Sequence, residues 1–358
     1  MSGVIVVIGA AGTVGVACVE ALLRHGERVL ATGRNITRLR RRLAHLSCER
    51  LSFAELDVQA STPWPAAVCA CRRFIQCAGP SFVLTDRVLI QLLTHCPGPG
   101  VFIDPGGDAA TIQRWQQPLA AAGWLGILGA GVQPGLVGVA IRALAARFPR
   151  PELLQVVTFT GGLQPLTCAG LAEYLQAVNN RTGYAGLCLQ QGRWQRVVDV
   201  PPTPNDFPAS ARVHPFVDEE AACAAEDLSL LALCSFNVTD STEITHLLNE
   251  MMVLGQIPAS ASQRIAQALE GKTPWFCLSA EEGTQRTVLS CIDSYQVTGA
   301  VAAWAMVNAH AQTPGASWFS QRPQSLAIWS HWQRQPPEGV RIIWHPPHNV
   351  LACEEGEI

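Results

Sequence analysis

The chain has 358 residues, of which 48% are hydrophobic and 15% are charged, and its formal net charge is −3. This length predicts two domains, and this composition predicts a large buried core and excludes an intrinsically disordered chain. A net charge this small gives no basic surface for nucleic acid, so no nucleic-acid partner is expected.

The thirteen cysteines follow no metal-binding pattern. No CxxC or HExxH motif occurs, and the closest pair is Cys69 and Cys71, so we expect no metal site. An odd, scattered set of cysteines is typical of reduced thiols in a cytoplasmic protein.

Residues 1–10 lack the basic region of a signal peptide, and the longest apolar stretch, about 121–145, is interrupted by polar residues and proline. No membrane span is therefore expected.

The first 130 residues alternate between short apolar runs and amphipathic segments. The predicted strands are 3–8, 28–32, 51–57, 73–77, 100–103 and 124–128. The predicted helices are one that ends near Gly26 and those at 35–46, 85–95 and 109–122. This alternation predicts an α/β, Rossmann-type, doubly wound parallel sheet.

The pattern changes after Gly135, where strands are no longer separated one by one by helices. Strands are expected near 154–160, 193–199, 229–237, 273–279 and 285–292, and helices near 167–179, 241–253 and 259–270. Such an order predicts a second, α+β domain with a mixed sheet. A strongly apolar helix is expected at 296–311.

A glycine loop, Gly9-Ala10-Ala11-Gly12-Thr13-Val14-Gly15, follows the first strand. Gly9 permits a sharp turn, Gly12 lets the backbone approach a pyrophosphate, and Gly15 lets the helix pack closely on the sheet. The free N–H groups at the start of the helix then bind phosphate. The loop predicts a dinucleotide site that includes Gly9, Ala11, Gly12, Thr13 and Val14, and a purely structural turn is the alternative.

The end of the second strand indicates which cofactor is bound. An NAD site places Asp or Glu there to hold the ribose 2′-hydroxyl, but this chain has Gly33 and Arg34, followed by Arg38. A guanidinium suits a 2′-phosphate, so Gly33, Arg34 and Arg38 predict NADP(H). The arginines at 40–42 are interpreted as a solvated helix face.

Several segments together resemble the saccharopine reductase-like family. They are GAAGTVG, the strand ending in Asp57, IQCAGP at 75–80, FIDPGGD at 102–108, GAGVQPGLVGVA at 129–140 and DSYQVTGAVAA at 293–303. The resemblance covers both domains in the right order. It implies three parts: a Rossmann domain (1–132), an inserted substrate and dimerisation domain (133–295), and a C-terminal helix and tail (296–358) that pack back on the Rossmann domain.

The resemblance also implies a chemistry. Family members commonly use NADPH, form homodimers, and make or break a C–N bond by hydride transfer at an imine carbon. Asp57 and Val58 would then lie on the adenine side of the cofactor. The nicotinamide side would be lined by Cys77, Ala78, Gly79 and Pro80.

One departure from the family pattern concerns the substrate. The family often has Asp in a GxDPG loop, where this chain has Gln133 before Pro134 and Gly135. An acidic residue would suit the ammonium group of a free amino acid, so these three residues predict a site for a different substrate. The single lysine, Lys272, also weakens any lysine-based dehydrogenase mechanism.

The chain also resembles a branch of the family that reduces the C=N bond of a thiazoline ring to a thiazolidine during siderophore assembly. The near absence of lysine, the segment 161–167 and the tryptophan-rich tail carry this resemblance. It implies a bulky imine substrate tethered to a carrier protein, with a nonribosomal peptide synthetase as a possible partner. A small-molecule imine is the alternative substrate.

Imine reduction needs a proton as well as a hydride, and three side chains are the candidate donors. Asp108, after the strand near 100–103, is one, and a role as a loop cap is the alternative for it and for Asp104. His214, in an expected loop, and Tyr184, in a glycine-rich segment, are the others, and structural roles are the alternative for both. Tyr295 is expected to be structural.

Two other functions remain open. A saccharopine-type or opine-type dehydrogenase acting on free amino acids and keto acids would need arginines for carboxylates, and Arg181, Arg193 and Arg212 are available. A non-catalytic NADP-binding sensor would bind the cofactor without turnover. The six tryptophans between Trp275 and Trp344 could line a pocket, but they more often pack a core or a dimer interface.

Overall fold

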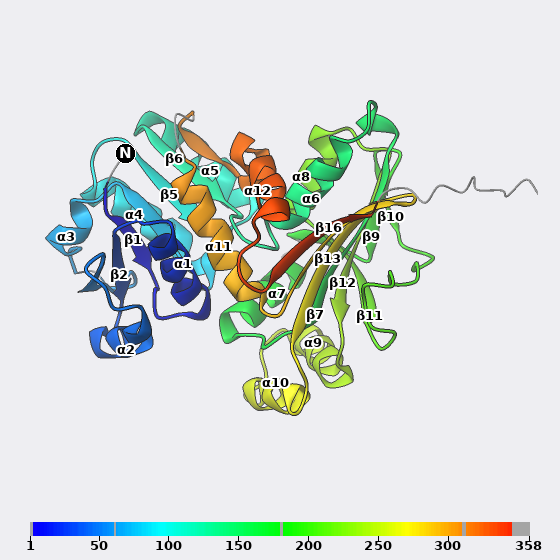
Figure 1. Cartoon of the computed structure of the whole chain (residues 1–358), viewed down its shortest axis with the longest axis horizontal. Helices are drawn as coiled ribbons and strands as arrows, with labels where there is room; N and C mark the ends of the chain where they lie inside the picture. Colours follow the sequence, from blue (N-terminus) through cyan, green and yellow to red (C-terminus); the bar gives the residue numbers. More distant parts are fainter. Residues whose placement is uncertain (1–2, 61, 180–181, 310–312, 346–358) are drawn as a thin grey trace, which may run out of the picture.

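The computed structural model describes residues 3–60, 62–179, 182–309 and 313–345. Figure 1 shows two sheets beside each other, one built from the N-terminal part of the chain and one from its second half. Helix α11 (Ser294–Val307) lies on the first of these two parts, against α1 (Thr13–Arg24).

Seven strands form the first sheet, in the order β15-β6-β5-β4-β1-β2-β3, and all neighbouring strands are parallel. The strands are β1 (Ile5–Ile8), β2 (Val29–Gly33), β3 (Leu51–Glu55), β4 (Arg73–Gln76), β5 (Gly100–Asp104), β6 (Trp124–Leu128) and β15 (Gly315–Trp318). The helices between them, besides α1, are α2 (Ile36–Arg42), α3 (Ala66–Cys69), α4 (Ser81–His95) and α5 (Ala109–Ala121). Strand β1 is buried along its whole length, as a central strand covered by helices on both faces requires.

Helices α1 and α11 approach each other closely at Gly299. A Cβ atom on Gly299 would lie 2.5 Å from the backbone nitrogen of Cys18, so only glycine permits this contact. The contact holds the first turn of α11, which contains Tyr295, near the carboxyl ends of β4 and β5.

The second sheet has nine strands and is mixed. Along the path β10-β9-β12-β7-β13-β14-β16, β7 is parallel to β12 and antiparallel to β13, and β11 pairs with both β12 and β8. The strands are β7 (Gln155–Leu163), β8 (Gly183–Ala185), β9 (Leu187–Gln190), β10 (Arg193–Arg196), β11 (Arg212–Asp218), β12 (Ala232–Thr239), β13 (Trp275–Glu282), β14 (Gln285–Cys291) and β16 (Val340–His345). The helices of this half are α6 (Leu136–Ala145), α7 (Cys168–Asn179), α8 (Glu219–Asp227), α9 (Thr242–Leu254), α10 (Ala261–Leu269) and α12 (Pro323–Arg334).

The predicted fold class is confirmed: a Rossmann-like parallel sheet with helices is followed by a second domain with a mixed sheet. The C-terminal segment divides between the two sheets. Helix α11 and β15 join the first half, whereas β16 pairs antiparallel with β14 at the edge of the second sheet. Within the described part of the chain, no helix is both long enough and apolar enough to cross a membrane.

Candidate functional site

A cleft of about 560 Å³ opens where strands β1, β2, β4 and β5 end, and we refer to it as the cofactor cleft. In open α/β sheets, ligands bind outside the carboxyl ends of the strands, where the strand order reverses. Thirteen of the fourteen predicted cofactor-binding residues line this cleft. Pro80 does not line it and instead precedes the first turn of α4.

The glycine loop is shaped for a phosphate group. Gly9 has φ +74°, and a Cβ atom there would lie 2.5 Å from the nitrogen of Ala78. A Cβ atom on Gly15 would lie 2.4 Å from the carbonyl oxygen of Gly9. Helix α1 has neither a side-chain cap nor an acidic residue in its first turn, so its terminal N–H groups face the cleft without a competing carboxylate. The residues present therefore fit the pyrophosphate of a dinucleotide.

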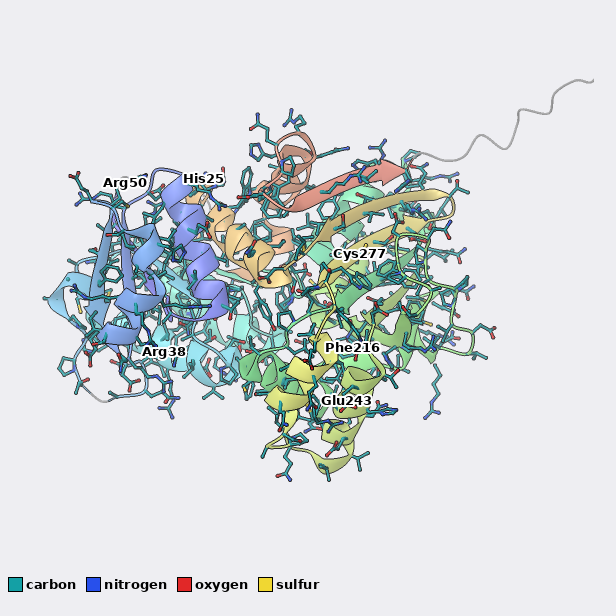
Figure 2. The ribbon with its side chains drawn as sticks, turned by 60° about the horizontal axis from the view of Figure 1, so that its bottom comes forward. His25, Arg38, Arg50, Phe216, Glu243 and Cys277 are labelled. Atoms are coloured by element: carbon teal, nitrogen blue, oxygen red, sulfur yellow. The ribbon has the colours of Figure 1, made fainter. Side chains whose placement is uncertain are left out.

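Two arginines stand at the β2 end of the cofactor cleft. Arg34 follows β2 directly, and Arg38 lies one turn further on, in α2; both are exposed (Figure 2 labels Arg38). Asn35 caps α2 by accepting a hydrogen bond from the Arg38 nitrogen at 2.8 Å. The Asp57 carboxylate accepts a hydrogen bond from the Gln59 nitrogen at 2.9 Å and so stabilises the turn that follows β3.

The opposite, inner end of the cofactor cleft is lined by hydroxyl and carboxyl groups. The Ser81 hydroxyl donates to Glu173 Oε2 at 3.1 Å, and the Ser81 backbone nitrogen donates to the other oxygen of Glu173. The Tyr295 phenol oxygen accepts a hydrogen bond from the Thr167 nitrogen at 3.0 Å. Burial raises the pKa of Glu173, its hydrogen bonds from Ser81 oppose this, and the charge of Asp108 adds to it.

Asp104 lies below this inner end, at the end of β5. Its two carboxyl oxygens accept hydrogen bonds from the Thr85 hydroxyl at 2.6 Å and from the Gly106 nitrogen at 2.8 Å. Burial raises its pKa to about 7, against the lowering effect of these two bonds. Asp104 also lines the cofactor cleft, although only 1% of its surface is exposed.

Comparisons with known proteins agree with this architecture. No family model matches the sequence, and no curated protein matches it. Apo saccharopine dehydrogenase (L-Glu forming) from Saccharomyces cerevisiae superimposes with a TM-score of 0.65 at 11% identity, covering 96% of this chain and 100% of that one. The chain has a saccharopine dehydrogenase-like fold. Yeast methylglyoxal/isovaleraldehyde reductase Gre2 with NADPH matches only 31% of this chain and 39% of its own, with a TM-score of 0.27 and 13% identity.

Within this saccharopine dehydrogenase-like fold, Asp108 acts as a helix cap. Its carboxylate accepts a hydrogen bond from the Thr111 nitrogen at 2.7 Å at the start of α5, and it does not line the cofactor cleft. A capping role, at the start of a helix and not in a loop as expected, therefore describes Asp108 better than a proton donor does.

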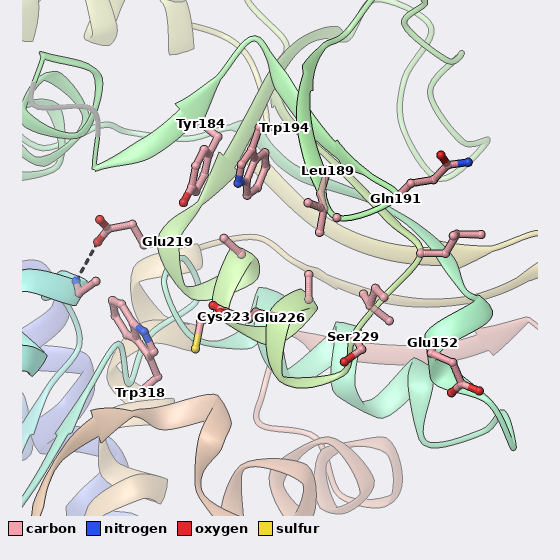
Figure 3. A pocket seen from close by; sticks show the side chains of 16 residues that line it. Glu152, Tyr184, Leu189, Gln191, Trp194, Glu219, Cys223, Glu226, Ser229 and Trp318 are labelled. Carbon is pink, nitrogen blue, oxygen red and sulfur yellow. Dashed lines mark hydrogen bonds between the residues drawn. The ribbon is translucent and has the colours of Figure 1, made fainter.

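Tyr184 lines a second cleft of about 780 Å³, between β8–β10 and α8 (Figure 3). Its ring stacks on Trp194, with ring centroids 3.5 Å apart and planes inclined by 6°. On the facing side, Glu219 accepts a hydrogen bond from the Ala109 nitrogen at 2.8 Å. Tyr184 does not line the cofactor cleft.

His214 lies on β11 and not in the expected loop, because it pairs with Asn237 of β12 in a regular antiparallel register. Its Nε2 atom is 3.5 Å from the Thr239 hydroxyl, and it lines neither cleft. Burial lowers its pKa, which keeps the ring neutral near pH 7. His214 is therefore poorly placed to donate a proton.

Gln133, Pro134 and Gly135 line neither cleft and connect the two halves of the fold. The Gln133 amide donates to Asp218 Oδ2 at 3.1 Å and to Asn237 Oδ1 at 3.0 Å. The Gly135 nitrogen donates to Glu220 at 3.1 Å. The structure therefore ties this loop to β11, β12 and α8, and the expected substrate contact stays a prediction.

Sequence reasoning missed the inner end of the cofactor cleft. Ser81 and Glu173 are 92 residues apart, and Thr167 and Tyr295 are 128 residues apart. Nothing local in the sequence pairs them. The one available signal was that Tyr295 falls inside a segment, 293–303, that resembles the family.

Proposed function

We propose that the protein is an NADPH-dependent oxidoreductase that reduces a C=N bond. In this proposal the substrate is a thiazoline on a carrier-protein-bound siderophore intermediate, and the chain corresponds to the thiazolinyl imine reductase of enantio-pyochelin biosynthesis. The observation that carries the proposal is the distribution of charge in the cofactor cleft. Of the described residues lining it, only Arg34 and Arg38 are basic, and both stand at the β2 end.

The basic end supports NADPH as the cofactor. The glycine loop and the first turn of α1 would hold the pyrophosphate, and Arg34 and Arg38 would hold the 2′-phosphate. The backbone from Cys77 to Gly79 would lie against the nicotinamide. When bound, NADPH supplies the hydride for the reduction.

The inner end supports an imine as the substrate. An imine carbon accepts a hydride while its nitrogen takes up a proton, and hydroxyl and carboxyl groups suit that proton transfer. A free amino acid or keto acid would instead require a cation for each carboxylate. Neither Arg193 nor Arg212 lines the cofactor cleft, and Arg181 lies outside the described residues.

A second candidate is a saccharopine-type or opine-type dehydrogenase acting on free amino acids, which the likeness to the yeast enzyme favours. At 11% identity that likeness concerns the fold and leaves the substrate open. A non-catalytic NADP-binding sensor is a third candidate, distinguished by cofactor binding without turnover.

We further propose a cytoplasmic homodimer that accepts its substrate from a nonribosomal peptide synthetase.

The deciding experiment follows NADPH oxidation by the purified protein with a carrier-bound thiazoline. Parallel reactions contain lysine or glutamate with keto acids. The proposal predicts NADPH consumption and thiazolidine formation with the thiazoline alone. Consumption only with amino acid and keto acid pairs would establish the dehydrogenase, and binding without any consumption would establish the sensor.

A further inference from the structure

We propose that Tyr295 is the proton donor to the substrate nitrogen, an inference that rests on the proposed imine reduction. Tyr295 lies in the first turn of α11 and lines the inner end of the cofactor cleft. Its phenol oxygen accepts a hydrogen bond from the Thr167 nitrogen at 3.0 Å. Gly170 lies close to the same oxygen, since a Cβ atom added to Gly170 would lie 3.4 Å from it.

The position of this hydroxyl is fixed from both sides. The buried side chain of Gln164 donates to the Ile292 carbonyl and accepts from the Ser294 nitrogen, each at 2.9 Å. It thereby ties the segment before α7 to the start of α11. On the other side, Ala169 contacts Gly79, where a Cβ atom would come within 3.0 Å. The segment 167–170 therefore lies against both the Tyr295 hydroxyl and Gly79, and Ala169, Gly79 and Tyr295 all line the cofactor cleft.

The proton on this hydroxyl is available to a ligand. A tyrosine hydroxyl can donate one hydrogen bond and accept others. The Thr167 N–H group occupies an acceptor position, and among the described residues no group is seen to accept the Tyr295 proton. The O–H bond can therefore be directed at a substrate atom in the cleft.

The carboxyl groups near this end of the cleft already accept hydrogen bonds from other residues of the protein. Both oxygens of Glu173 accept hydrogen bonds from Ser81, and both oxygens of Asp104 accept from Thr85 and Gly106. Asp108 caps α5. The charges of Glu173 and Asp108 also raise the pKa of Asp104.

The reaction balances with NADPH as the reductant. Hydride transfer forms the C–H bond on the imine carbon while the π bond of C=N breaks, and the electron pair of that bond moves to nitrogen. The nitrogen forms its N–H bond with the Tyr295 proton, leaving NADP⁺ and a tyrosinate. The Thr167 N–H group stabilises the tyrosinate, and water entering the open cleft restores the proton.

Tyr295→Phe tests this role, and the two other tyrosines provide matched controls. Tyr174→Phe removes a hydroxyl whose only described contact is Met252 Sδ at 3.9 Å, and Tyr184→Phe removes one from the second cleft. With a carrier-bound thiazoline, Tyr295→Phe is expected to lower kcat about a hundredfold, within the usual contribution of a general acid. Both controls should stay within about twofold of the wild type.

Two further readouts separate catalysis from a structural role. NADPH affinity, followed by its fluorescence, should be unchanged in Tyr295→Phe. The solvent deuterium isotope effect on kcat should rise, and the effect of deuterated NADPH should fall, because proton transfer becomes limiting.

A kcat within about threefold of the wild type would overturn the role of Tyr295. So would an equal loss of NADPH affinity and kcat, which indicates cofactor binding. A wild-type protein that never reduces the thiazoline overturns the proposed function itself, and this role with it.

Discussion

Replacing Arg34 by alanine should weaken the binding of NADPH far more than that of NADH. A hydrogen bond to a charged group contributes about 1.5–3 kcal/mol, and the lower end applies here because Arg34 is exposed and Arg38 remains. Since about 1.4 kcal/mol corresponds to a factor of ten, the Kd of NADPH should rise about tenfold. The Kd of NADH, which lacks the 2′-phosphate, should stay within about twofold.

The assay is a titration of each cofactor by calorimetry at low and high salt. The Arg34→Ala/Arg38→Ala double variant should lose about a hundredfold in NADPH affinity if the two contributions add. Arg40→Ala is the control, because the Arg40 guanidinium packs 5.4 Å from the centre of the Phe53 ring and does not line the cofactor cleft. Equal losses for NADPH and NADH would refute the assignment of Arg34 to the 2′-phosphate.

Three other predictions concern the first sheet. Gly9→Ala should abolish NADPH binding, because φ is +74° and the added Cβ would lie 2.5 Å from the Ala78 nitrogen; retained binding in a calorimetric titration would contradict this. Asp108→Ala should cost about 1 kcal/mol in urea unfolding through the lost cap, with turnover retained; a loss of turnover in a folded variant would restore Asp108 as a catalytic candidate. The pKa of Asp104 is about 7 in the folded protein. From about pH 4 to pH 7 the folded carboxyl therefore keeps its proton while the same carboxyl in the unfolded chain has lost it. The free energy of unfolding should then fall as pH rises through this window. Asp104→Asn should flatten that fall in urea titrations, and an unchanged slope would show that Asp104 does not titrate this way.

The cofactor half of the fold was predictable because its signals are local. The buried run of β1, the glycine loop and the first residues of α2 lie within 40 residues, and each has a physical requirement that the sequence displays directly. The residues Cys77 to Gly79 after β4, and Asp57 and Val58, were instead expected from the family resemblance and from no local pattern. The short-range patterns account for the glycine-loop residues, Gly33 and the two arginines that line the cleft.

The substrate end was less predictable because distant segments build it. Tyr295 was expected to be structural, and its contact with Thr167 depends on how α11 docks against the segment before α7. His214 was expected in a loop, yet it lies on β11, where both His214 and Pro215 pair with β12. The last strand, β16, carries no local signal of its pairing with β14. Such contacts arise from tertiary packing, which local periodicity does not encode.

The most direct test of the central claim follows the hydrogen delivered from the cofactor. The wild-type protein is incubated with a carrier-bound thiazoline and NADPH deuterated at the nicotinamide C4 position, and the released product is examined by mass spectrometry. Imine reduction predicts a thiazolidine with one deuterium on the former C=N carbon. An undeuterated thiazoline recovered unchanged, with deuterium instead in the product of an amino acid and keto acid pair, would contradict it.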